Sequence, residues 1–421
     1  MAVRTRSVAE SCAAAKRAAR ALAGAPTAAK DAALAATARL LEERTEEILE
    51  ANAADLADER AAGLSAALRD RLTLTRDRVA AMAAGVRVVA ALDDPVGEEL
   101  ERRTLASGIE LRKVRVPLGV VAVVYEARPN VTIDCAALTI KSGNAIVLRG
   151  SSYAERSNGA LAAIVREALG EAGLPDDAVV LLAGGGREEL AELATQEGLV
   201  DLLIPRGGEG LKEAIKAVAT VPVMYAAAGN CHVYVHADAD LEMARRIAVN
   251  AKVQRPGVCN AAETLLVDAA VAPRALPAIL GDLAAAGVEL VGDERARELA
   301  GPTPVGAAEE EDWDREYLDL KLAVAVVDSV EDAIEHVNAH GTGHSEAIVT
   351  GSERAAEEFV AGVDAAAVYV NASTRFTDGF EYGMGAEIGN STQKLHARGP
   401  IGMRELMTFK YVARGDGQIR V

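Results

Sequence analysis

Cys259 has the surroundings that a nucleophilic cysteine needs. It stands in the stretch QRPGVCN, residues 254–260, where a Pro-Gly turn precedes the thiol and Arg255 supplies a cation. A turn exposes the sulfur, and a cation with nearby amide dipoles favours the thiolate, the reactive form of a group whose ordinary pKa is about 8.5. The alternative is a buried structural cysteine, which is the commoner fate of this residue type. We predict covalent catalysis at Cys259.

A glycine-rich turn, IPRGGEGL at residues 204–211, is a candidate phosphate-binding site. It follows a buried strand pattern and opens a helix. Gly207 and Gly208 would let backbone N–H groups and the positive end of the helix approach a pyrophosphate. The stretch lacks the GxGxxG fingerprint, and a glycine turn at such a junction often binds nothing. The glycines at 184–186 give a weaker signal of the same kind.

Three histidines in the stretch HVNAHGTGH, namely His336, His340 and His344, could indicate a metal site. The zinc-protease pattern requires glutamate directly after the first histidine, and Val337 stands there instead. Gly341 is expected to end the helix before His344 can join its face. We therefore predict a solvated helix end and no metal.

The elements that must position these residues alternate between short aliphatic strands and helices. Residues 7 to about 92 have a helical pattern, and 105–117 alternates like a half-buried strand. Later strands are predicted at 120–125, 145–148, 178–183, 200–204, 232–236, 264–267, 322–327 and 366–370, with helices at 131–141, 155–170, 187–197, 209–219 and 240–250. The alternation of strands and helices begins again after Gly229, and this pattern predicts two doubly wound α/β domains.

Composition limits the classes of function. A chain of 421 residues exceeds the size of one hydrophobic core, so two or three domains are expected. Its net charge, 45 − 63 = −18, disfavours binding to nucleic acid or to anionic membrane surfaces. No apolar run is long enough to span a bilayer, and the basic, alanine-rich start suits an amphipathic helix better than a targeting segment. Four scattered cysteines without a CxxC pair indicate neither disulfides nor zinc and favour the cytoplasm.

Several longer stretches resemble the gamma-glutamyl phosphate reductase family of the aldehyde dehydrogenase superfamily. They are PLGVVAVVYEARPNVTIDCAALTIKSGNAIVLRG, IPRGGEGL, GNCHVYV, NAKVQRPGVCNAAETLLV and AVYVNASTRFTDGFEYGMGAEIGNSTQKLHARGPIG. The likeness runs in order from about residue 10 to the C-terminus. It implies an aldehyde-dehydrogenase-like α/β fold with a cofactor-binding domain (1–97 and 119–228), a catalytic domain (229–399) and a small β oligomerisation flap (98–118 and 400–421).

The resemblance also implies a reaction. Members of this family use NADPH to reduce L-glutamate 5-phosphate to L-glutamate 5-semialdehyde and phosphate, the second step of proline biosynthesis. Cys259 would attack the acyl carbon and form a thioester, which hydride then reduces. The Cys259 backbone N–H and the Asn130 side chain are the expected donors to the developing oxyanion.

Cofactor and substrate residues follow from the same resemblance. Arg149 and Ser151 would hold the adenosine ribose, and an arginine there favours a 2′-phosphate and hence NADP over NAD. Gly207 and Gly208 would take the pyrophosphate, and Glu316 the nicotinamide ribose. The candidate substrate-binding residues share donor groups suited to an anionic substrate: Arg255, Asn371, Ser373, Thr374, Arg375, Lys394, His396 and Arg398. Lys394 and Arg398 could instead pair with surface acids.

One absent residue favours reduction over hydrolysis. Ordinary aldehyde dehydrogenases carry a glutamate base that activates water, whereas the matching stretch 225–230 here reads YAAAGN. A coenzyme-A-acylating aldehyde dehydrogenase would lack that base too, and a non-catalytic oligomeric binding protein could keep the fold, so both remain alternatives. The expected partners are a small-molecule substrate, further copies in a homo-oligomer, and glutamate 5-kinase as the source of the labile acyl phosphate.

Overall fold

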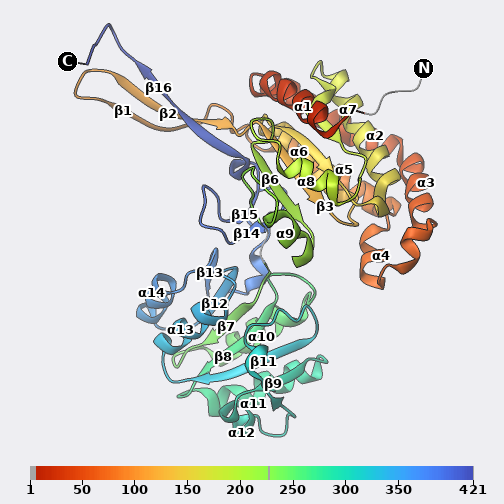
Figure 1. The fold of residues 1–421 in the computed structure, drawn as a ribbon. Helices are drawn as coiled ribbons and strands as arrows, with labels where there is room; N and C mark the ends of the chain where they lie inside the picture. The colour runs from red at the N-terminus through yellow and green to blue at the C-terminus, as the bar shows by residue number, and fades with distance from the viewer. Residues whose placement is uncertain (1–5, 226–227, 421) are drawn as a thin grey trace. The chain divides into compact units, whose positions relative to one another are not determined.

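The chain forms two compact units in a computed structural model that describes residues 6–225 and 228–420 (Figure 1). Unit 1 contains the described residues up to 225 together with 383–389 and 401–420. Unit 2 contains 228–382 and 390–400. The α/β class with two parallel sheets, expected from the sequence, is confirmed.

Helices dominate the first part of unit 1, as predicted. They are α1 (Val8–Ala23), α2 (Thr27–Glu43), α3 (Thr45–Leu56), α4 (Ala66–Leu72) and α5 (Arg76–Ala91). A capping box begins α1: the Ser7 hydroxyl accepts the Glu10 N–H at 3.2 Å, and the Glu10 carboxylate accepts the Ser7 N–H at 2.9 Å. Helix α1 ends at Gly24, and Pro26 caps the start of α2, where its missing N–H costs no helical hydrogen bond.

A four-stranded parallel sheet forms the core of unit 1, in the order β5-β4-β3-β6. Its members are β3 (Val120–Tyr125), β4 (Ala145–Arg149), β5 (Val179–Leu181) and β6 (Leu202–Arg206), connected by α6 (Asn130–Lys141), α7 (Glu155–Glu171) and α8 (Arg187–Ala194), with α9 (Glu209–Lys216) after β6. The strand order reverses between β3 and β6. Doubly wound sheets bind their ligands beyond the carboxyl ends of the strands at such a switch point.

A separate three-stranded antiparallel sheet carries the predicted flap. It consists of β1 (Glu99–Thr104), β2 (Glu110–Pro117) and β16 (Met407–Arg414), in that order (Figure 1). All six residues of β1 are exposed, and the predicted strand at 105–117 begins later than expected because residues 106–107 form the turn of the hairpin. The outer edges of β1 and β16 have no strand partner among the described residues.

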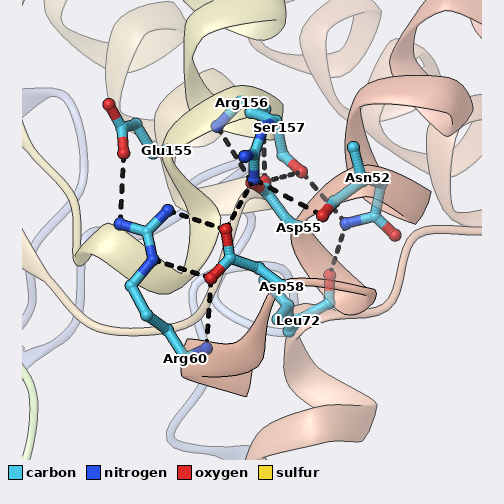
Figure 2. Close-up of polar contacts among 9 residues, drawn as sticks. Asn52, Asp55, Asp58, Arg60, Leu72, Glu155, Arg156 and Ser157 are labelled. Carbon is cyan, nitrogen blue, oxygen red and sulfur yellow. Dashed lines mark hydrogen bonds and ion pairs between the residues drawn. The ribbon is translucent and has the colours of Figure 1, made fainter. Parts of the chain in front are cut away.

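A buried carboxylate anchors α7, the helix that follows β4. Asp55 accepts hydrogen bonds from the backbone N–H groups of Arg156 (3.2 Å) and Ser157 (2.8 Å) and from the Ser157 hydroxyl (2.7 Å). Figure 2 shows it at the centre of a cluster that Asp58 and Arg60 extend towards solvent. A carboxylate at a helix N-terminus satisfies free N–H groups and the helix dipole together. The cap therefore fixes the start of α7 a few residues beyond the end of β4.

Unit 2 is built on a seven-stranded parallel sheet in the order β10-β9-β11-β8-β7-β12-β13. The strands are β7 (Cys231–Val235), β8 (Ala262–Asp268), β9 (Glu289–Gly292), β10 (Gly306–Ala307), β11 (Lys321–Val327), β12 (Ser345–Val349) and β13 (Ala367–Val370). The helices are α10 (Leu241–Val253), α11 (Ala272–Ala285), α12 (Glu294–Leu299), α13 (Val330–His340) and α14 (Glu353–Gly362). A short pair, β14 (Asn390–Ser391) and β15 (Gly399–Pro400), completes the unit.

None of the helices in the described ranges has both the length and the apolar character needed to cross a bilayer.

Candidate functional site

Cys259 lies in the turn between α10 and β8 and is partly accessible. The other cysteines are buried. Burial raises the pKa of Cys12 to about 11 and also raises the pKa values of Cys135 and Cys231. Cys259 is therefore the thiol best placed to meet a reactant.

Gly229 packs directly against the backbone of Cys259. A Cβ atom built on Gly229 would lie 1.4 Å from the Cys259 carbonyl oxygen and 2.7 Å from its Cα atom. The Gly229 N–H donates to Glu316 Oε1 at 2.7 Å, so the residue predicted to hold the nicotinamide ribose lies beside the same turn. Only glycine allows this approach of two backbone segments.

A polar network fixes the segment that contains Gly229. The Asn230 side-chain amide donates to the carbonyls of Trp313 (2.6 Å) and His340 (2.9 Å), and its N–H donates to Thr342 Oγ1 (3.1 Å). Cys231 Sγ donates to the Cys259 carbonyl at 3.2 Å. The turn at residues 254–260, which contains Cys259, is thus held by backbone packing and by a buried thiol.

The histidine-rich stretch belongs to this support and is not a solvated helix end, which corrects that prediction. His336 is half-buried, with its ring centroid 4.6 Å from that of His340 and 5.4 Å from that of Trp313. Burial lowers the pKa of His336 to about 3. His344 is fully buried and follows the end of α13. Among residues 6–225 and 228–420, no three potential ligands form a metal-binding group.

A buried ion pair joins the two elements on either side of the 254–260 turn. Lys252, at the end of α10, lies 2.5 Å from Glu263 in β8, and both side chains are inaccessible to solvent. Burial lowers the pKa of Lys252 and raises that of Glu263 to about 7. The attraction between the two charges opposes both shifts. The pair joins the two elements that flank Cys259.

The predicted residues Ser373, Thr374 and Arg375 lie against the same turn. Thr374 Oγ1 donates to the Asn260 carbonyl at 2.7 Å, and the Ser373 hydroxyl accepts the Arg375 N–H at 3.3 Å. The Arg375 guanidinium donates to Gln254 Oε1 at 2.9 Å. The structure therefore brings Arg255, Cys259, Glu316 and the 373–375 segment together within unit 2.

Other predicted substrate residues have different partners. The Asn371 side chain bonds to the Thr350 N–H and to its carbonyl, each at 2.9 Å, so both ends of its amide are occupied. Lys394 and Arg398 form ion pairs with Asp364, which is the alternative that the sequence left open for them. His396 is exposed.

Asn130 begins α6 in unit 1 and donates its side-chain amide to Asp134 Oδ2 at 3.0 Å. Asp134 is largely buried, and desolvation raises its pKa to about 6, although the Asn130 hydrogen bond and the Arg206 charge oppose the shift. The spacing of four residues places both side chains on one face of the helix. The predicted oxyanion donor is therefore oriented by a carboxylate.

Four of the five predicted cofactor residues, Arg149, Ser151, Gly207 and Gly208, follow strands β4 and β6 of the unit 1 sheet, whereas Glu316 lies in unit 2. Gly207 and Gly208 lie between β6 and α9, and no side chain caps that helix. Ser151 Oγ is buried without a hydrogen-bond partner among the described residues. It borders a cavity of about 750 Å³ that Glu155, Asn158 and residues 180–184 also line. This volume is within the range of small-molecule sites.

Arg149 has partners that the sequence did not indicate. Its Nε atom lies 3.2 Å from Glu189 Oε1, and Nη2 donates to the carbonyls of Gly185 and, at 3.0 Å, Gly186. These bonds join the end of β4 to the start of α8. A 2′-phosphate would therefore share Arg149 with Glu189 or displace it.

Of the stretch lacking an acid at 225–230, Ala226 and Ala227 lie outside the described residues. Sequence reasoning missed Gly229, Asn230, Cys231 and Asp134 as parts of the site. A signal existed for them, because they fall within stretches that carry the family resemblance. Their contacts join segments far apart in the chain, which local patterns do not reveal.

Comparison with known proteins gives consistent matches. The model of the aldehyde dehydrogenase family matches residues 2–305. Gamma-glutamyl phosphate reductase of Moorella thermoacetica is 55% identical over 406 residues, covering 96% of this chain and 97% of its own. The enzyme of the same name from Thermobifida fusca is 54% identical, covering 93% of each chain. The crystal structure of gamma-glutamyl phosphate reductase from Thermotoga maritima superposes with a TM-score of 0.96 at 45% identity, covering 99% of this chain and 100% of that one.

Proposed function

The chain belongs to the aldehyde dehydrogenase family and, within it, to the gamma-glutamyl phosphate reductases, and on this premise we propose that it reduces L-glutamate 5-phosphate to L-glutamate 5-semialdehyde and phosphate. The proposed reaction is a step of proline biosynthesis, uses NADPH and proceeds through a thioester on Cys259. The observation that carries the proposal is the partly accessible thiol of Cys259, held in a turn against Gly229 while the other three thiols are buried. Arg255 and Arg375 add positive charge beside that turn.

The thiolate attacks the acyl carbon, so that a C–S bond forms and the bond from carbon to the phosphate oxygen breaks. NADPH, when bound, supplies the hydride that reduces the thioester. Collapse of the resulting thiohemiacetal breaks the C–S bond and returns the thiolate with the aldehyde. The Cys259 N–H and the Asn130 amide donate to the oxyanion, and Asp134 orients Asn130.

The residues of unit 1 fit a dinucleotide. The unpartnered Ser151 hydroxyl can bond to a ribose, and the N–H groups after Gly207 and Gly208 can hold a pyrophosphate. Arg149 supports NADP over NAD through its charge, which Glu189 partly compensates. Glu316, beside the nucleophile turn, would hold the nicotinamide ribose.

A spectrophotometric assay tests this function. Purified protein with glutamate 5-semialdehyde and phosphate should reduce NADP faster than NAD, should need phosphate and should not respond to coenzyme A. Cys259→Ala should abolish turnover. Coenzyme-A-dependent oxidation without phosphate would favour the acylating alternative. Full activity of Cys259→Ala would contradict the thioester mechanism.

We also propose that the chain is a homo-oligomer joined through the β1-β2-β16 sheet. Phe409 and Tyr411 are 45% and 55% exposed on β16, and the outer edge of that strand lacks a partner in the described chain. Exposed edges and aromatic side chains are typical of surfaces that associate. Sedimentation should show an oligomer that the double variant Phe409→Glu, Tyr411→Glu dissociates. Adding glutamate 5-kinase with its substrates tests the proposed kinase contact in the same instrument.

A further inference from the structure

Two arginines of unit 2, Arg255 and Arg375, carry charges without a carboxylate partner. Neither forms an ion pair with any residue in the described ranges, whereas Arg245, Arg295 and Arg398 pair with Asp282, Asp328 and Asp364. Three other arginines of the unit also lack an ion pair within the described residues, but all are exposed: Arg246, Arg274 and Arg297. Arg375 is half-buried and Arg255 is exposed. Uncompensated charge that is partly withdrawn from water is costly and is retained where an anion binds.

Hydrogen bonds join the segments that carry these two arginines to the nucleophile turn. The Asn260 side chain, next to Cys259, donates to the carbonyls of Thr377 (2.9 Å) and Arg375 (3.4 Å). The Arg375 Nε atom donates to Gln254, the neighbour of Arg255. The 254–260 turn and the 373–377 segment are therefore one bonded assembly.

The electrostatics agree with this geometry. Burial lowers the pKa of Arg375, and the nearby positive charge of Arg255 lowers it further, whereas Asp378 and the thiol of Cys259 act in the opposite direction. An anion placed between the two guanidinium groups would relieve their repulsion. Guanidinium groups also match the oxygens of phosphate with paired hydrogen bonds.

Lys394 and Arg398 are poor candidates for the same task. Both contact Asp364, and Arg398 also donates to the Asp364 carbonyl at 3.1 Å. These two cations lower the pKa of Asp364, so its carboxylate stays ionised and neutralises part of their charge. A second anion would have to displace it.

We propose that Arg255 and Arg375 bind the phosphoryl group of the acyl phosphate, and that Lys394 and Arg398 do not; this assignment rests on the proposed function. When Cys259 attacks, the electron pair of the broken C–O bond leaves with the phosphate, which then takes a proton from water to become HPO₄²⁻. The negative charge on the leaving group grows in the transition state. Two guanidinium groups there stabilise that state more than the ground state.

The phosphate-dependent reverse reaction tests the assignment. Arg375→Gln and Arg255→Gln should each raise the KM for inorganic phosphate about 10- to 100-fold, the loss expected for one charge-assisted contact, and leave the KM for NADP unchanged. Arg375→Lys should restore part of the loss. Arg354→Gln, a surface variant whose arginine pairs with Glu358, is the matched control and should behave as the parent.

Thiol protection gives a readout independent of turnover. Inorganic phosphate should slow iodoacetamide labelling of Cys259 in the parent but only at higher concentration in Arg375→Gln. Unchanged phosphate KM and protection in both arginine variants, or an equal rise in Lys394→Gln, would overturn the assignment. Absence of phosphate-dependent NADP reduction in the parent would instead refute the proposed function.

Discussion

A Cβ atom on Gly229 would lie 1.4 Å from the carbonyl oxygen of Cys259. No side-chain rotation can relieve such an overlap, because both partners are backbone atoms. One of the two segments would have to move by more than an ångström. The position of Cys259, the proposed nucleophile, therefore depends on a glycine that precedes it by thirty residues in the sequence.

Gly229→Ala is accordingly expected to lower kcat/KM by about 100-fold or more, since a displacement near 1 Å at a reacting group has effects of this size. Steady-state assays of NADPH oxidation with the acyl phosphate measure it. Gly281→Ala is the matched control, because Gly281 lies in α11 with only Thr303 near its added methyl, at 3.9 Å. Equal activities of the two variants would contradict the role given to Gly229.

Selective labelling of the native protein should identify one fast thiol. Cys259 is partly accessible, whereas Cys12, Cys135 and Cys231 are at most 1% exposed, with pKa values raised by burial. Iodoacetamide at neutral pH should therefore modify Cys259 at least about tenfold faster than the others, because the thiolate is the reacting form. Peptide mapping over time gives the four rates. A second cysteine reacting as fast would refute this order.

Much of the fold could be predicted because buried parallel strands are almost continuously apolar. Residues 120–125 and 145–148 show this pattern and form β3 and β4. Strand β12, which lies between β7 and β13, escaped prediction because it begins with Ser345 and Glu346, polar residues that are nevertheless buried. The N–H and Nδ1 of His232 on the neighbouring strand β7 contact one oxygen of Glu346, at 2.7 and 2.9 Å, a long-range pairing that a local pattern does not contain.

The candidate site likewise has some features that local sequence patterns indicate and others that depend on distant parts of the chain. The Pro-Gly turn before Cys259 and the glycines at 207–208 are local signals, and local structure was enough to indicate them. The partners that set the charge of each predicted cation are not local. Glu189 lies forty residues after Arg149, and Asp364 lies thirty before Lys394. Whether an arginine is free for a ligand is therefore decided by tertiary structure.

Asp134 should make the stability of the protein depend on pH. Its pKa is about 6 in the folded chain against an ordinary value of 3.8, so between these values the folded state holds a proton that the unfolded state has lost. The free energy of unfolding consequently falls as pH rises through this window. Asp134→Asn removes the effect. The unfolding free energy of this variant minus that of the parent should be about 1 kcal/mol larger at pH 8 than at pH 5, as measured by urea denaturation.

The exposed residue Asp93 provides the comparison for that experiment. Asp93→Asn makes the same substitution at the surface and should change the unfolding free energy by less than about 0.5 kcal/mol. If Asp134→Asn gave the same shift at pH 5 and pH 8, the carboxyl group would not be titrating in the folded chain as described.

The cap on α7 should be a large local contributor to the stability of unit 1. Asp55 is 1% exposed and accepts bonds from two backbone N–H groups and a hydroxyl (Figure 2). Asp55→Ala leaves these buried donors without an acceptor, so it should cost about 3 kcal/mol of unfolding free energy. Asp58→Ala removes a neighbouring carboxylate that also pairs with Arg156 but lies nearer to solvent, and its effect should be much smaller. Denaturation curves of both variants measure the difference. Equal losses would mean that solvent-side ion pairing, rather than capping of the α7 N-terminus, stabilises this region.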